Sequence, residues 1–499
     1  MKRSILALIL LLSLVTTGHS QNSQVLYFMN LPQATTLNPA FQPAGRIYIG
    51  LPGISDISVR LDNNFLNLSD FFINGVISDS TLSFLEKGPW VNNFLDGLGK
   101  KNSLEPQVGV KLLGFAFTVK DNLRFSLDIT ERAEVNMVFP GDFFRLGFSG
   151  NSDFIGKTLD FSSLRTDMMV YHETGLGASA NITEKLRIGG RLKILSGVAS
   201  AYLNNNHFTL TVNEDNTHTA VADFSMNISA PVFFTTDSDG SVHGAEFNNA
   251  RFNDAWNVIS YLKEMANPGL GIDLGAEYRF SDKLVVSAAV NDLGFIRWKR
   301  DLSQLTVNST FQFNGQTMQD VYDESVEFGE MMNWAIDSLQ NVLRLEDLPQ
   351  KYTTYLPAKL TAAFSYTPVR YFTAGLLSQT RFEGPQVHQS VTLSGNFHFG
   401  NVFSTTLAYT AANRRYDNIG FGMAVRGGPS QFFVVVDNIC LKFTNYTSGE
   451  GKVMIPEKIN TVNARLGFNL LFGYRERDKV KEKETKKVRE KVKETKKER

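Results

Sequence analysis

Apolar and polar residues alternate along most of this chain in long runs. This period-two alternation is typical of β-strands that have one apolar face and one polar face. In residues 123–132, Leu123, Phe125, Leu127 and Ile129 share one face, and mostly charged or hydroxyl side chains share the other. The pattern predicts an all-β protein. It recurs in four further segments, which are 186–194, 269–280, 355–366 and 387–399.

The length of these runs favours a membrane-spanning barrel over a soluble sandwich. Strands of soluble proteins are usually about 5–6 residues long, whereas a strand tilted across a bilayer needs about 9–11 residues. Several runs also carry an aromatic residue near one end, as the girdles of outer-membrane barrels do. These residues are Phe280, Tyr366, Phe399 and Tyr474. We therefore predict a transmembrane antiparallel β-barrel.

Short polar links and long excursions alternate between the predicted strands. The links include 120–122, 183–185 and 281–283, and the excursions include 138–166 and 314–352. Outer-membrane barrels have short turns on the periplasmic side and longer loops outside. We predict a wall of about 14 strands, within a range of 14–16. Three other strand-like runs are interpreted as hairpins within loops, namely 206–214, 219–229 and 304–313.

Three segments have apolar residues at helical spacing, which are 80–98, 247–265 and 319–345. They predict helical insertions in the loops of the barrel. Three arrangements are open: a helix that packs on the barrel rim, one that plugs the lumen, and one that lies on the membrane surface.

The first twenty residues have the order of a secretory signal peptide. Lys2 and Arg3 precede the apolar stretch Ile5–Val15, and we expect cleavage near Ser20 and Gln21. The stretch is shorter than the about 20 residues that span a bilayer, and an uncleaved anchor is the alternative. We expect a protein of the cell outer membrane. Its predicted parts are the signal peptide at 1–20, a lumenal or periplasmic segment at 21–44, the barrel at 45–474 and a charged periplasmic tail at 475–499.

The net charge of zero hides an acidic body and a basic tail. Residues 475–499 hold thirteen Lys and Arg against seven Asp and Glu, whereas residues 21–474 hold 35 against 43. The tail either binds cell-wall polymer or a periplasmic protein, or it is a solvated extension. Other expected partners are outer-membrane lipid and the barrel-assembly machinery. No nucleic-acid partner is expected.

Charged side chains on the polar strand faces are candidates for the lumen. They either line a pore or pair with one another and fill the barrel. His388 and His398 share a face, but they lie about 33 Å apart at about 3.3 Å per residue, too far to share a metal ion. We expect no metal, no cofactor and no enzymatic activity. The candidate lumen residues are Arg124, Asp128, Arg132, Arg187, Arg191, Lys193, Asp273, Glu277 and Arg279.

The last alternating run, residues 464–474, resembles the β-signal by which the barrel-assembly machinery recognises a final strand. That signal has a polar residue, a glycine and two spaced hydrophobic residues. The positions that match it are Arg465, Gly467, Leu470 and Phe472.

Two short motifs resemble a known family. One is Asn38-Pro39-Ala40 within residues 27–41. The other is the run Gly269–Trp298, which contains Gly-Ile-Asp-Leu-Gly-Ala-Glu-Tyr-Arg-Phe and then Asn291-Asp292-Leu293-Gly294-Phe295. They are similar to a family of Bacteroidota outer-membrane β-barrels of unknown function, distantly like the FadL and PorV barrels. The resemblance covers most of residues 25–474 and implies about fourteen strands with an N-terminal segment in the lumen. It implies no functional residues.

These expectations leave two functions open. One is passive transport of hydrophobic or small solutes. The other is a structural or secretion-associated barrel that binds other envelope proteins through its loops and basic tail.

Overall fold

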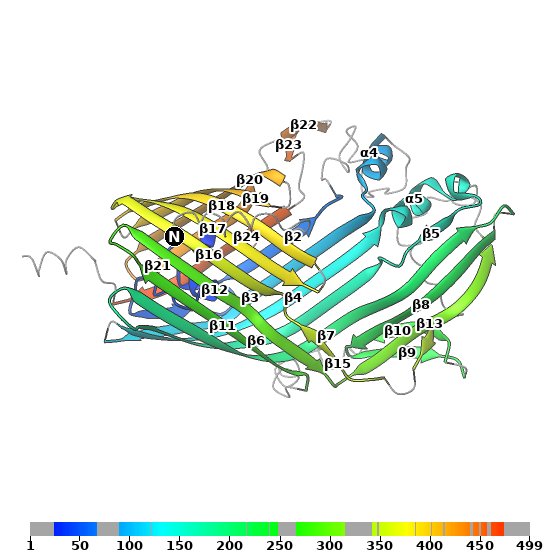
Figure 1. Ribbon diagram of the computed structural model, residues 1–499, viewed down its shortest axis with the longest axis horizontal. Coiled ribbons are helices and arrows are strands. Elements are labelled where there is room, and N and C mark those ends of the chain that lie inside the picture. The colour runs from blue at the N-terminus through cyan, green and yellow to red at the C-terminus, as the bar shows by residue number, and fades with distance from the viewer. Residues whose placement is uncertain are drawn as a thin grey trace, which may run out of the picture.

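The chain folds into a closed antiparallel β-barrel that continues at one end into a curved sheet (Figure 1). The signal peptide, the tail from residue 475 and most of 247–265 and 319–345 lie outside the described residues. The computed structural model describes residues 24–66, 89–120, 122–215, 217–238, 240–247, 266–314, 342–346, 349–384, 386–400, 402–412, 415–439, 443–448, 451–456 and 461–473.

The barrel wall has fourteen strands, which confirms the predicted fold class. The first strand is interrupted: β1 (Ile47–Gly50) and β2 (Ile57–Asn63) both pair with β24 on one side and β3 on the other, and so close the barrel. The other strands are β3 (Lys101–Val119), β4 (Leu123–Pro140), β6 (Arg165–Asn181), β7 (Leu186–Val212), β11 (Pro268–Arg279), β12 (Leu284–Trp298), β16 (Ala358–Val369), β17 (Phe372–Glu383), β18 (Gln386–Phe399), β19 (Phe403–Ala412), β20 (Arg415–Gly427), β21 (Ser430–Ile439) and β24 (Thr461–Phe472).

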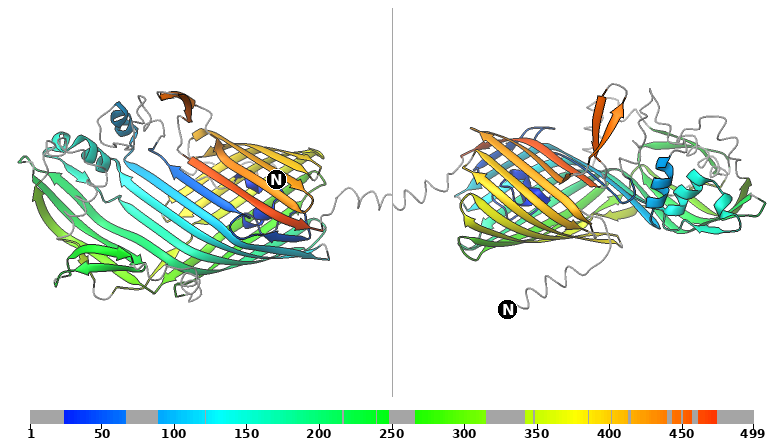
Figure 2. Two further views of the ribbon diagram at one scale, coloured as in Figure 1. Left: turned by 180° about the vertical axis from the view of Figure 1, so that it is seen from behind. Right: turned by 90° about the horizontal axis from the view of Figure 1, so that it is seen from above.

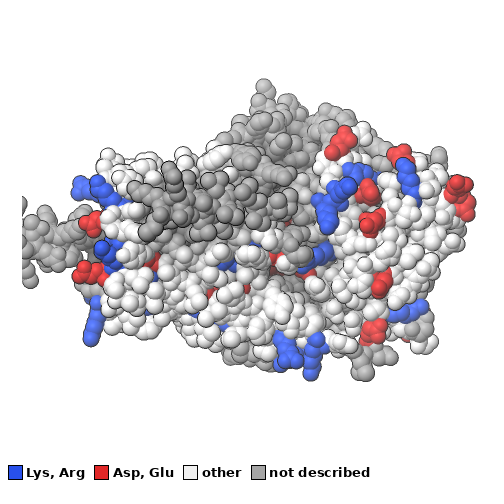
Figure 3. Space-filling model, in the orientation of Figure 1, with Lys and Arg blue, Asp and Glu red and all other residues white. Residues whose placement is uncertain are grey.

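The alternation in the sequence becomes an apolar outside and a polar inside. On β11, Leu270, Ile272 and Leu274 are 42–50% exposed, whereas Asp273 between them is 1% exposed. Charged side chains gather at the two ends of the molecule and leave a largely uncharged band between them (Figure 3). A closed barrel satisfies all backbone hydrogen bonds between strands, so an apolar outer face lets it span lipid. None of the described helices is long and apolar enough to cross a membrane.

The runs predicted as loop hairpins at 206–214, 219–229 and 304–313 lie outside the fourteen-strand wall, and the first two pair with each other as a hairpin. The difference from the prediction is that all three belong to the main sheet. The first is the far end of β7, which continues for 27 residues, and the other two are β8 (Thr217–Ser229) and β13 (Leu302–Asn314). These strands extend the main sheet beyond the barrel, and β13 pairs with β8 along its whole length (Figures 1 and 2). The long-range pairing satisfies backbone groups that an isolated hairpin would leave to solvent.

The loops at the extended end carry short elements. Helix α4 (Pro89–Gly97) lies within the predicted 80–98 segment, whereas α5 (Gly141–Ser149) was not predicted. Aromatic residues hold the two helices together, with ring centroids of Phe94 and Phe148 5.6 Å apart. The short strands are β5 (Thr158–Asp160), β9 (Val232–Thr236), β10 (Val242–Phe247), β14 (Arg344–Leu345), β15 (Tyr352–Tyr355), β22 (Phe443–Ser448) and β23 (Gly451–Pro456).

Candidate functional site in the barrel lumen

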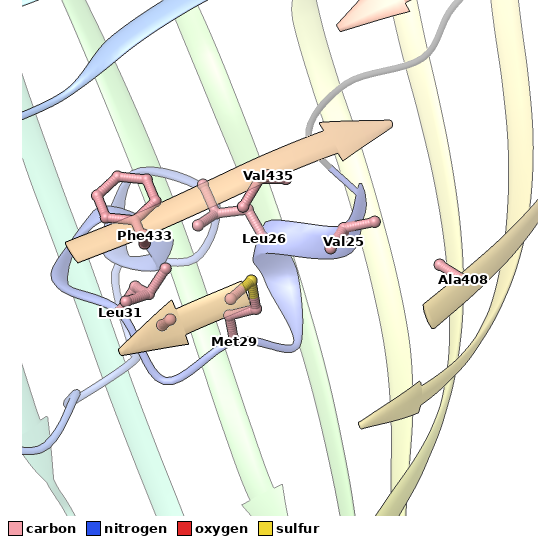
Figure 4. Packing of buried hydrophobic residues seen from close by; sticks show 8 residues of the cluster. Val25, Leu26, Met29, Leu31, Ala408, Phe433 and Val435 are labelled. Carbon is pink, nitrogen blue, oxygen red and sulfur yellow. The ribbon is translucent and has the colours of Figure 1, made fainter. Parts of the chain in front are cut away.

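The segment that precedes β1 lies inside the barrel. It contains a single helical turn, α2 (Gln24–Tyr27), and a 3-10 helix, η1 (Pro32–Thr36). We call residues 24–44 the lumenal segment. Its apolar side chains pack against the inner faces of β19, β20 and β21 (Figure 4). The cluster comprises Val25, Leu26, Met29, Leu31, Ala408, Ala424, Phe433 and Val435, none more than 4% exposed.

Buried amides anchor the same segment by hydrogen bonds. Gln33 and Asn469 are both fully buried and exchange two bonds, of 2.7 and 3.1 Å. Asn38 donates to the Tyr27 hydroxyl at 3.2 Å and to main-chain oxygens of β11 and β12. Its own Oδ1 accepts the backbone N–H of Ala40 at 3.0 Å. The segment is therefore fixed to opposite sides of the wall.

Glycines in the wall make room for the Asn38-Pro39-Ala40 turn. A Cβ added to Gly275 would lie 2.1 Å from Asn38 Oδ1, and one added to Gly189 would lie 2.2 Å from the Pro39 oxygen. No side chain larger than hydrogen fits at such distances without a shift of the segment. The Asn38-Pro39-Ala40 motif therefore packs directly against the backbone of Gly189 and Gly275.

Beyond the segment, buried ion pairs link neighbouring strands along the inner face of the wall. Lys193 on β7 binds Asp273 at 2.8 Å and also binds Asp292, and Lys359 on β16 binds the second oxygen of Asp292 at 2.7 Å. Asn291 and Asp292 together oppose the single residue Asp273, which is a β-bulge. Asp292 has a φ of 60°, and its N–H donates to Asp273 at 2.7 Å. The bulge turns the Asp292 carboxylate towards both lysines.

Among the described residues, the other predicted lumen residues form further ion pairs, except Arg124 and Arg279. Asp128 accepts Lys111 at 2.7 Å. Arg132 and Arg191 both bind Glu173, at 2.8 and 3.0 Å, and Arg187 binds Glu277 at 3.1 Å. Arg124 donates to the Gly45 oxygen at 2.9 Å. Arg279 ends β11, and within the described part of the chain no ion pair joins it.

Several members of the network were not among the predicted lumen residues. They are Asp56, Lys111, Glu173, Asp292 and Lys359. Lys359 and Glu173 stand on the polar faces of alternating runs, so alternation alone could have identified them. Asp56 lies between β1 and β2 and Asp292 in a bulge, where alternation gives no signal.

The four residues of the predicted assembly signal lie on β24. Arg465 points inward and forms a two-nitrogen ion pair with Asp56, and a Cβ on Gly467 would lie 2.2 Å from the Ser55 oxygen. Leu470 is half-buried, and Phe472 is 42% exposed on the outer face. Recognition of this strand by an assembly machinery remains a prediction.

A second ionic cluster contains three residues of the kind that bind metals. Ligand atoms of Glu105, Glu383 and His388 lie within 4.8 Å of one another. However, Arg381 lies 3.4 Å from Glu105 and 2.8 Å from Glu383, and Arg60 lies 3.6 Å from Glu105. A metal ion would stand beside two guanidinium groups that already neutralise these carboxylates. We therefore interpret the cluster as a buried ion-pair network.

A cavity of about 100 Å³ lies between the lumenal segment and the first ionic network. Thr36 and Leu37 of the lumenal segment form one side of it, and Asn291 donates to the Thr36 oxygen at 3.3 Å. Most of the remaining lining is polar or charged. It includes Asp56, Arg132, Glu134, Lys193, Asp292 and Lys359.

The chain is similar to one family model and to several solved structures. A family model described as a family of unknown function (DUF5723) matches residues 39–437. No curated protein matches the chain. Similar solved structures include the Pseudomonas putida toluene transporter TodX (11% identity, 89% of this chain and 94% of that chain, TM-score 0.42), the Ralstonia pickettii toluene transporter TbuX (9%, 91% and 96%, 0.39) and a Pseudomonas aeruginosa FadL homologue (10%, 91% and 96%, 0.40).

Proposed function

The chain belongs to the DUF5723 family, whose function is unknown, and we propose that it lets small polar solutes pass passively through an outer membrane. In this proposal the lumenal segment closes the passage and moves to open it. The supporting observation is a lumenal cavity with charged walls beside that segment.

The chemistry of the cavity argues for a polar rather than a hydrophobic solute. Its walls carry lysine, arginine and carboxylate groups, and Leu37 and Val108 are its only large apolar residues among the described lining. A hydrophobic molecule there would gain little apolar contact and would displace water from charged groups, which costs free energy. We therefore propose a small polar solute rather than a hydrophobic one.

The lumenal segment suits a movable closure because its polar contacts are individually modest. A hydrogen bond contributes about 0.5–1.5 kcal/mol net, and the contacts of Gln33 and Asn38 are of this kind. The glycines beneath Asn38 present no side chains that interlock with it. A segment held in this way can leave the wall without breaking any strand pairing of the barrel.

A reversible disulfide tests this closure directly. Gly422 on β20 lies so close to Val25 that an added Cβ would be 2.6 Å from Val25 Cγ1, and it would also be 2.6 Å from Met29 Sδ, so a cross-link at this point requires Met29 to shift. The variant Val25→Cys/Gly422→Cys, in a Cys440→Ser background, would tie the segment to β20. In reconstituted liposomes we expect solute leakage after reduction and little leakage when oxidised.

The Cys440→Ser parent is the matched control, and its leakage should not depend on the redox state. Equal leakage from the oxidised and reduced variant would contradict the proposed closure. No leakage from the parent, the reduced variant or the wild type would contradict passage itself.

The second candidate is a structural or secretion-associated barrel. The observation that favours it is the sheet of β7, β8 and β13, which continues beyond the closed barrel (Figure 2). Such an extension offers a surface for other envelope proteins. It predicts a barrel that binds partners and conducts nothing.

A further inference from the structure

The cavity beside η1 has more cationic than anionic side chains in its lining. Six Lys and Arg and three Asp and Glu contribute to it. Its volume of about 100 Å³ equals that of roughly three water molecules at about 30 Å³ each. A space of this size suits an ion such as acetate or phosphate.

Two of the three lining carboxylates are already neutralised by protein cations. Asp292 binds Lys193 through one oxygen and Lys359 through the other. Asp56 accepts two nitrogens of Arg465. These carboxylates have little capacity left for a cationic ligand.

All six lining cations also pair with carboxylates, but Arg132 keeps donors that have no protein acceptor in the described part of the chain. Its Nε donates to the fully buried Glu173 at 2.8 Å, and its side chain is 27% exposed. Among the residues that the structure describes, none accepts a hydrogen bond from its two terminal amino groups. A guanidinium presents its N–H groups in a planar fork that matches a carboxylate or a phosphate. Arg132 is one of the residues that line the cavity.

We propose that the cavity is a binding site for a small oxyanion, with Arg132 as its principal contact and Lys359 as a second cation. Lys359 is 18% exposed and uses one of its three ammonium donors on Asp292. The inference names the class of solute for the proposed passage and in that sense rests on it. The site itself needs no movement of the lumenal segment.

Glu134 is the group that opposes anion binding. It stands two residues from Arg132 on β4, lines the cavity and accepts the Tyr171 hydroxyl at 3.0 Å. Its negative charge repels an anion held by Arg132. Arg132 and Glu134 should therefore act on affinity in opposite directions, which a purely structural role would not produce.

Calorimetric titration of the full chain in detergent with sodium acetate and with sodium phosphate tests the site. For Arg132→Gln we expect affinity to fall by about tenfold or more, since one charge-assisted hydrogen-bonded contact is lost. For Glu134→Gln we expect tighter binding. Arg187→Gln, which removes a lumenal cation that is paired with Glu277 and does not line the cavity, should leave affinity unchanged.

Folding of each variant is checked by heat-modifiable gel migration. Glu173 keeps Arg191 as a partner in Arg132→Gln, so we expect a folded barrel. If that variant does not fold, Arg132→Lys keeps the charge without the fork and should show a smaller loss of affinity. Absence of binding by the wild type, or equal affinity of the wild type and the folded Arg132 variant, would overturn the site.

The two proposals fail separately. Anion binding by a barrel that never leaks would overturn the passage and leave the site as a ligand site. Leakage from liposomes without acetate or phosphate binding would overturn the site and leave the passage.

Discussion

Gln33 in the lumenal segment and Asn469 on the last strand, 436 residues later, exchange two amide hydrogen bonds in the interior of the barrel. Neither side chain is exposed to solvent. The pair therefore joins the segment that fills the lumen to the strand that closes the wall. Gln33 also donates to the Ser55 oxygen at 2.8 Å, and Asn469 also donates to Gln431 at 3.1 Å. Loss of the Gln33 amide therefore leaves the buried Asn469 oxygen without its donor.

Removal of one member of this pair should loosen the lumenal segment. For Gln33→Leu we expect the segment to lose about 1–3 kcal/mol of binding to the wall, the usual cost of a buried unsatisfied polar group. Protease cleavage within residues 24–44 of the reconstituted protein measures this loosening. The triple variant Gln33→Leu/Asn469→Leu/Gln431→Leu removes all three amides that bond to one another. It should be cleaved more slowly than Gln33→Leu, and faster cleavage would contradict the pairing.

A methyl group beneath the Asn38-Pro39-Ala40 turn should displace the segment. Gly275→Ala places its Cβ 2.1 Å from Asn38 Oδ1, so the turn must move. We expect a higher rate of solute leakage from liposomes than for the wild type. Gly427→Ala is the matched control on the same barrel, since a Cβ there meets no atom within 4 Å. Equal leakage from both variants would show that the turn does not close the passage.

Loss of the Lys193 ammonium should destabilise the barrel. Lys193→Met leaves Asp273 buried without its lysine, and breaking a buried ion pair in this way costs about 3–5 kcal/mol. The temperature at which the folded band disappears in unboiled gel samples should fall. The additional substitution Asp273→Asn removes the uncompensated charge and should restore part of the loss. The control Lys185→Met changes an exposed turn residue and should leave the temperature unaltered.

Deletion of residues 475–499 should separate the barrel from its partners. We expect the shortened chain to keep its heat-modifiable migration, because the wall closes at β24, which ends at Phe472. If the tail binds cell-wall polymer or a periplasmic protein, cross-linked material should be lost from the shortened chain. A matched variant with the tail order scrambled at constant charge distinguishes sequence-specific binding from attraction by charge alone.

The strand wall could be predicted from the sequence because each side chain on a strand has only two directions. Alternation places Leu270 and Leu274 on the outer face and Asp273 on the inner face without any knowledge of the neighbouring strands. The length of the runs distinguishes strands that cross a bilayer from the shorter strands of soluble proteins. The same reasoning identified charged residues such as Asp128 and Arg191 on the inner face. It could not show whether they lined a pore or paired with one another.

Only the tertiary structure decided which groups meet inside the barrel. Gln33 and Asn469 lie 436 residues apart in the chain, and Lys193 and Lys359 reach Asp292 from two other strands, β7 and β16. These contacts depend on barrel closure and on a bulge that local pattern does not reveal. The pairing of β8 with β13 could not be predicted either, because the two runs are far apart in the chain and meet only in the folded sheet. Local alternation fixes the direction of a side chain, and the closed sheet fixes what it touches.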